Sequence, residues 1–164
     1  MKAEHQRLIQ LVLLVLVVIV IGLLVWWSEL RDAGLVDGRE EIVLPTPNCN
    51  PRGLFCLSRD RGYSISLELD RDATYLSPFS VRVKLFGFSR EQLRHVRVRF
   101  AMPDMYMGEN QIVLVQAAPD GSEWQGEAVL PVCLTGRRDW VATVLVEGEE
   151  RVIRSDFAFV IDTQ

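Results

Sequence analysis

Histidine is scarce in this sequence, and the short motifs that mark common active sites are missing. The chain has two histidines, His5 and His95, and only His95 follows the long apolar run near the N-terminus. Catalysis of the Ser-His-Asp or Cys-His kind requires a positioned base, and a zinc site requires more His and Cys ligands than follow this run. A Gly-rich phosphate loop, HExxH and CxxC are also absent. We therefore expect no catalytic residues and a protein that is not an enzyme.

An excess of positive charge is also missing. The chain has 18 Lys and Arg against 22 Asp and Glu, a net charge of −4. A nucleic-acid-binding protein would carry a basic footprint, and a surface that binds acidic lipids would carry clustered Lys and Arg. We therefore expect no nucleic-acid partner. His95 and the neighbouring arginines fall on the polar face of a predicted strand, where solvated side chains are expected.

One apolar run dominates the N-terminal part of the chain. Residues 8–27 carry no charge, and Gln10 is their one polar side chain. About 20 apolar residues are needed for a helix to cross a bilayer core of ~30 Å. Lys2 and Arg7 precede the run, whereas acidic residues dominate the segment after it. The flank of a membrane-spanning helix that is richer in Lys and Arg is the one that stays in the cytoplasm.

These features predict a cytoplasmic tail at 1–7 and a transmembrane helix at 8–27. The protein would be a single-pass protein of the bacterial inner membrane, with its domain in the periplasm. The alternative is a cleaved signal peptide. Its apolar core would be shorter, about 7–15 residues, and would end at a small-x-small cleavage site, whereas this run ends at Trp26-Trp27-Ser28.

Whether the cysteines form disulfides depends on that location. Disulfides persist outside the cytoplasm, and Pro51 and Gly53 between Cys49 and Cys56 allow the chain to double back. We therefore predict a Cys49–Cys56 disulfide, which leaves Cys133 as a free thiol. The prolines around this loop oppose helix, and residues 28–62 are predicted to be a stalk and lead-in with one short edge strand at 42–44.

Residues 63–164 are predicted to form an all-β domain. Apolar and polar residues alternate, which is typical of half-buried strands, over seven segments: 63–69, 81–85, 95–100, 112–117, 124–130, 140–147 and 152–161. Seven short strands separated by turns predict an immunoglobulin-like β-sandwich. Trp140 begins the sixth segment on its apolar face and is predicted to be a core residue, because Trp is highly buried on average.

Methionine is concentrated in one predicted loop. Met102, Met105 and Met107 lie within six residues, after the third segment. Cys133 lies in the loop after the fifth segment, and alternate loops fall at the same end in an up-and-down arrangement. Thioethers and thiolates are soft ligands that select Cu(I), so these four residues are candidate Cu(I) ligands. The alternative is that the methionines are adaptable apolar side chains that fill the sandwich end or a partner surface.

The chain resembles the FixH/YtkA-like group of small membrane-anchored bacterial proteins. The resemblance rests on the apolar run, the Met-Pro-Asp-Met-Tyr-Met-Gly segment at 102–108, the stretch with Gly121, Trp124, Gly126 and Ala128, and the Trp140 segment. It implies an accessory protein that handles copper in the assembly of a respiratory oxidase, so an integral membrane complex would be its partner. The alternative is a structural or interaction subunit that docks on such a complex without metal.

Overall fold

The computed structural model of the protein describes Leu14 and residues 16–23, 39–106, 108–133 and 135–161. The chain divides into two compact units, residues 1–38 and 39–164. Leu14 and residues 16–23 are helical. The predicted tail at 1–7, most of the predicted span at 8–27 and the candidate ligand Met107 lie outside the described residues. In the described part of the chain, no helix combines the length and hydropathy that a membrane crossing requires.

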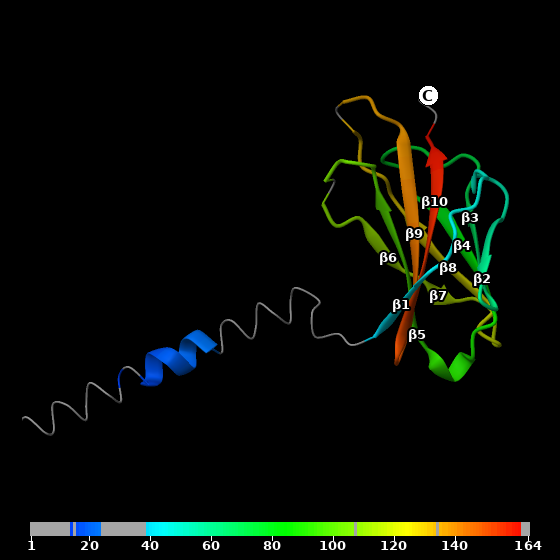
Figure 1. Cartoon of the computed structure of the whole chain (residues 1–164). Helices are drawn as coiled ribbons and strands as arrows, with labels where there is room; N and C mark the ends of the chain where they lie inside the picture. Colours follow the sequence, from blue (N-terminus) through cyan, green and yellow to red (C-terminus); the bar gives the residue numbers. More distant parts are fainter. Residues whose placement is uncertain (1–13, 15, 24–38, 107, 134, 162–164) are drawn as a thin grey trace, which may run out of the picture. The chain divides into compact units, whose positions relative to one another are not determined.

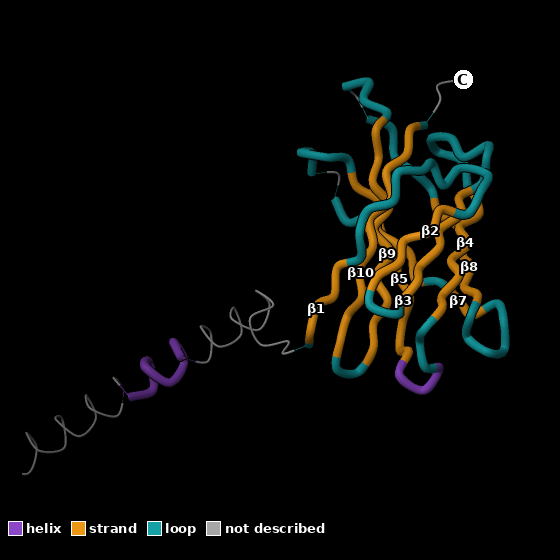
Figure 2. The backbone as a smooth tube through the Cα atoms, turned by 45° about the vertical axis from the view of Figure 1, so that its right-hand side comes forward, coloured by secondary structure: helices purple, strands orange, loops and turns teal. Residues whose placement is uncertain are grey.

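The second unit is a β-sandwich of two five-stranded sheets (Figures 1 and 2). The first sheet has the order β1-β10-β9-β5-β6 and the second the order β2-β3-β4-β8-β7. The strands of the first sheet are β1 (Glu40–Val43), β10 (Arg151–Val160), β9 (Asp139–Gly148), β5 (Leu93–Ala101) and β6 (Gln111–Val113). Those of the second are β2 (Cys56–Asp60), β3 (Tyr63–Leu69), β4 (Phe79–Phe86), β8 (Glu123–Ala128) and β7 (Val115–Gln116). One short 3-10 helix, η1 (Arg90–Gln92), precedes β5.

Alternation along the strands builds the core between the sheets. In β4 every second residue is buried and the residues between are exposed, as expected because successive side chains point to opposite faces of a sheet. Phe79, Phe100 and Phe159 meet edge to face across the core, with ring centroids 5.9 and 6.3 Å apart. Trp140 is 1% exposed, which confirms the prediction that it is a core residue.

The sandwich begins earlier and has more strands than the sequence predicts. Ten strands occur in the described part of the chain rather than about seven. β1 overlaps the short edge strand predicted at 42–44, whereas β2 was not predicted within the stalk and lead-in at 28–62, and the compact unit begins at Arg39 rather than at residue 63. The inward residues of β2 are Cys56 and Ser58. Ser58 is buried, and its hydroxyl donates to the carbonyl of Pro45 at 2.6 Å. Because the buried face of this strand carries a half-cystine and a serine, its sequence lacks the alternation of apolar and polar residues that predicts a strand.

The predicted strand at 112–117 divides between the two sheets. β6 pairs with β5 in the first sheet, and β7 pairs with β8 in the second. Between them Leu114 is 2% exposed and donates its backbone N–H to Val96 at 2.8 Å. Gly126 lies beneath it, where a Cβ atom would come within 2.9 Å of Leu114 Cδ2. This crossing segment joins the two sheets along one side of the sandwich.

The predicted disulfide is present. Cys49 and Cys56 are bonded, with their Cα atoms 5.9 Å apart. The loop between them is fixed to β3, because Gly53 donates to the carbonyl of Leu69 and Leu69 donates to that of Pro51, both at 2.8 Å. The disulfide therefore anchors the segment that leads into β2.

Candidate functional site

Two loops from different sheets meet at one end of the sandwich. The first is a tight turn after β5, in which Met105 donates its backbone N–H to the carbonyl of Met102 at 3.3 Å and Asp104 takes a positive φ of 58°. The second follows β8 and carries Cys133. Cys133 Sγ lies 3.7 Å from Met105 Sδ. The structure thus places side by side two sulfur atoms that are 28 residues apart in the chain.

The surroundings of Cys133 favour its thiolate form. The hydroxyl of Thr135 lies 3.0 Å from Cys133 Sγ. This hydrogen bond is the main reason that the pKa of the thiol lies below its usual value, and the backbone N–H groups of Thr135 and Arg137 and the Arg137 charge act in the same direction, against desolvation. Hydrogen bonds to the charged form stabilise it. The thiolate is the form of cysteine that binds metals and acts as a nucleophile, and these contacts lower the free energy needed to form it at Cys133.

The structure describes three of the four predicted sulfur ligands. Met105 is partly buried and packs against the core beside Cys133, which is a free thiol and 7% exposed. Met102 is 3% exposed and belongs to the hydrophobic core. Met107 is not among the described residues. The structure therefore supports a pair, Cys133 and Met105, as the centre of the candidate site.

Arg137 is a feature of this site that the sequence patterns did not reveal. Its Nη1 donates to the carbonyl of Pro103 in the methionine turn at 2.9 Å, and its Nε donates to Asp139 Oδ1 at 3.0 Å. The hydrogen bond with Asp139 is the main cause of a raised pKa for Arg137 and a lowered pKa for Asp139. The only signal in the sequence is the run Arg137-Arg138-Asp139, which is equally typical of a solvated loop.

A chain of hydrogen bonds connects this loop to the core. Trp140 Nε1 donates to the hydroxyl of Tyr75 at 3.3 Å, and that hydroxyl donates to the carbonyl of Arg137 at 3.1 Å. The rings of Tyr75 and Trp140 are 6.4 Å apart. The Arg137 backbone is therefore fixed to a buried indole, which leaves its side chain free to reach the other loop.

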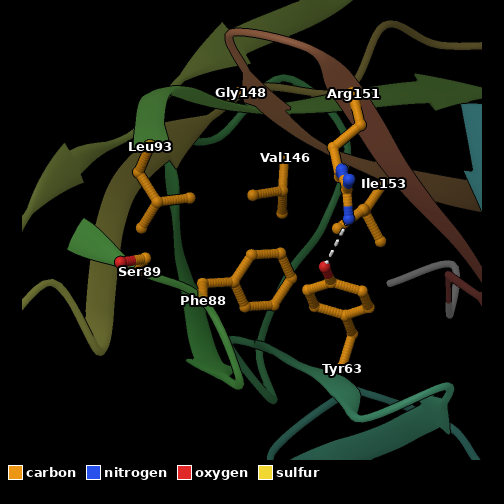
Figure 3. A pocket seen from close by; sticks show the side chains of 8 residues that line it. All are labelled: Tyr63, Phe88, Ser89, Leu93, Val146, Gly148, Arg151 and Ile153. Carbon is orange, nitrogen blue, oxygen red and sulfur yellow. Dashed lines mark hydrogen bonds between the residues drawn. The ribbon is translucent and has the colours of Figure 1, made fainter. Parts of the chain in front are cut away.

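Other described parts of the domain offer weaker candidate sites. The described residues contain no group of three or more His, Cys, Asp or Glu side chains that could hold a metal ion. At the other end of β5 from Met102, a small cavity lies among Tyr63, Phe88, Leu93, Val146 and Ile153, with Arg151 donating to Tyr63 at its mouth at 3.0 Å (Figure 3). Its volume of about 20 Å³ holds roughly one water molecule. This cavity is a packing gap rather than a ligand site.

Comparison with known proteins gives little further information. No protein-family model matches the chain, and no curated protein matches it. Among solved structures, a DUF4785 family protein from Legionella pneumophila is similar, with 18% identity and a TM-score of 0.42. The match covers 61% of this chain and 28% of that one. Such a similarity does not show membership of the FixH/YtkA-like group and carries no argument about function.

Proposed function

We propose that this protein is a membrane-anchored extracytoplasmic accessory protein whose immunoglobulin-like sandwich binds Cu(I) through Cys133 and Met105. The observation that carries the proposal is the 3.7 Å separation of Cys133 Sγ and Met105 Sδ. Two sulfurs that share a tetrahedral metal at ~2.3 Å are ~3.8 Å apart. A thiolate and a thioether are both soft donors, which favour Cu(I) over hard ions. The pair thus has the spacing and the chemistry of two ligands of one ion.

Further residues could complete the coordination. Met107 follows Met105 by two positions in the sequence and is kept as a candidate thioether ligand. Met102 is assigned to the core, because it continues the buried series Val96, Val98 and Phe100. The contact between Thr135 Oγ1 and Cys133 Sγ at 3.0 Å lowers the pKa of the thiol, which favours the metal-binding thiolate form.

The location is supported by the sequence and by the disulfide. The apolar run at 8–27 with its basic N-terminal flank fits an anchor with a cytoplasmic N-terminus. The Cys49–Cys56 disulfide fits an oxidising compartment such as the periplasm. The resemblance to FixH/YtkA-like proteins points to a respiratory oxidase complex in the bacterial inner membrane as the partner.

One observation favours a second function, docking without metal. Tyr106 is 89% exposed beside Met105, and Leu76 is 68% exposed where its backbone binds Leu130 near the Cys133 loop. Exposed apolar side chains that gather at one end are typical of interaction surfaces. In this alternative the sulfur pair is a packing contact under a surface that binds a membrane complex.

A Cu(I) competition experiment separates the two functions. The full chain in mild detergent, kept reduced and anaerobic, is titrated with Cu(I) against a chromogenic chelator. We expect the chain to withdraw one equivalent of Cu(I), and we expect Met105→Leu and Cys133→Ser each to weaken binding at least tenfold. Met102→Leu is the matched control, because a volume-conserving change in the core costs less than about 1.5 kcal/mol and leaves the sulfur pair intact. No binding by the unaltered chain, or equal binding by Met105→Leu, would exclude the copper site and favour docking.

A further inference from the structure

Two side chains join the two loops that carry the sulfur atoms: Asn110, whose Nδ2 donates to the carbonyl of Val129 at 3.3 Å, and Arg137. The guanidinium of Arg137 donates from Nη1 to the carbonyl of Pro103, two residues before Met105. Its Nε and Nη2 donate to the carboxylate of Asp139 at the start of β9. Its own backbone is held by Tyr75. Arg137 therefore reaches from a fixed point on the Cys133 side to the backbone of the methionine turn.

The backbone hydrogen bonds of the two turns do not by themselves hold the sulfur atoms together. The methionine turn is closed by one backbone hydrogen bond of 3.3 Å, and the Cys133 turn by one of 3.1 Å from Gly136 to the Cys133 carbonyl. Neither bond crosses from one loop to the other. The planar fork of an arginine has several donors in fixed directions, so a single side chain can set the distance between two loops.

We infer that Arg137 is the positioning residue of the sulfur pair, holding Cys133 against Met105 by binding Pro103 and Asp139 at once. The inference deepens the proposed function, on which it rests for the claim that the pair binds Cu(I). The juxtaposition itself is a property of the metal-free protein. It follows that the spacing of the pair depends on the fork of Arg137 and not only on its charge.

The test measures the juxtaposition without metal. Full-length protein in detergent is labelled with 13C at the methionine methyl groups, and the nuclear Overhauser effect between the Met105 methyl and the Cys133 β protons is recorded. We expect this signal to weaken at least threefold in Arg137→Met, and less in Arg137→Lys, which keeps the charge and one donor. Arg138→Met is the matched control, because Arg138 is the exposed neighbour, and its signal should equal that of the unaltered protein. We also expect at least tenfold weaker Cu(I) binding in Arg137→Met.

The outcomes separate this inference from the proposed function. An unchanged signal in Arg137→Met overturns the positioning role, whatever the copper result. A signal lost in Arg137→Met, in a protein that binds no Cu(I), retains the positioning role and removes the copper function. Should Arg137→Met fail to fold by circular dichroism, Asp139→Asn replaces it. That change keeps the arginine but removes the carboxylate that orients it, and a full signal there overturns the inference.

Discussion

Replacing Trp140 with alanine tests how the core and the candidate site are connected. The indole is 1% exposed and lies on β9 in line with Ala142, Val144 and Val146, which are equally buried. Its Nε1 donates to the Tyr75 hydroxyl, which in turn holds the backbone of Arg137. The substitution removes a large apolar surface and the first hydrogen bond of this chain.

The expected loss is large relative to the free energy of unfolding of the whole domain. Truncating a buried aromatic side chain to alanine costs about 3–5 kcal/mol, and a lost hydrogen bond adds about 1 kcal/mol. A domain of this size is stable by about 5–15 kcal/mol. With a urea slope of about 2 kcal/mol per M, the midpoint of unfolding should fall by roughly 2–3 M.

Urea unfolding of the full chain in detergent, followed by circular dichroism, measures this shift. Trp124→Ala is the matched control, because Trp124 also donates its indole N–H to a backbone carbonyl, that of Gly121 at 2.9 Å, but is only partly buried. Its cost should be less than half as large. A midpoint shift below about 0.5 M for Trp140→Ala, or equal shifts for the two variants, would refute the assignment of Trp140 as a core anchor.

Two further predictions concern the backbone and the location. Gly87→Ala should destabilise the domain by more than about 2–3 kcal/mol, because φ is +85° and the new Cβ atom would collide with the carbonyl oxygen of Gly62. Gly62→Ala is the matched control, because Gly62 has a similar φ of +84° but open space around the new Cβ atom. It should cost only about 1–2 kcal/mol. Thermal melts compare the two, and equal costs would show that the close approach is relieved by small shifts. A reporter active only outside the cytoplasm, fused after Gln164, should be active, and a reporter active only inside should not; the reverse pattern would contradict the proposed topology.

Period-two alternation predicts most of the fold because most strands bury one apolar face. β3, β4, β5, β8, β9 and β10 each contain, or nearly coincide with, a segment predicted from the sequence. β2 was missed because its inward residues are a half-cystine and a serine, whose burial depends on the disulfide and on Pro45. The division at Leu114 was missed because both halves continue the same alternation, and only the partners of each half distinguish them.

Loop order predicts part of the candidate site. It places Cys133 near the methionines, and the structure finds Cys133 Sγ beside Met105 Sδ. Whether this pair binds Cu(I) stays a prediction. The core position of Met102 extends the alternation of Val96, Val98 and Phe100 by one step, and it was missed because the three methionines were assigned together to one loop. The role of Arg137 could not be predicted, since its partner Pro103 is 34 residues away and offers a backbone carbonyl, which has no sequence signature.

The parallel pairing of β1 and β10 affects how the domain would bear a mechanical load. Glu40 lies opposite Arg151 and Val43 opposite Arg154, so the two strands begin at the same end of the sandwich. Tension between the N-terminal side of β1 and the C-terminal side of β10 would slide these strands past each other in opposite directions. The inter-strand hydrogen bonds, including those from Glu40 and Leu44 to the carbonyls of Glu150 and Arg154, would then be strained together rather than in turn. A strand of four residues would in this way act as a shear clamp when the domain is pulled from the N-terminal side of β1.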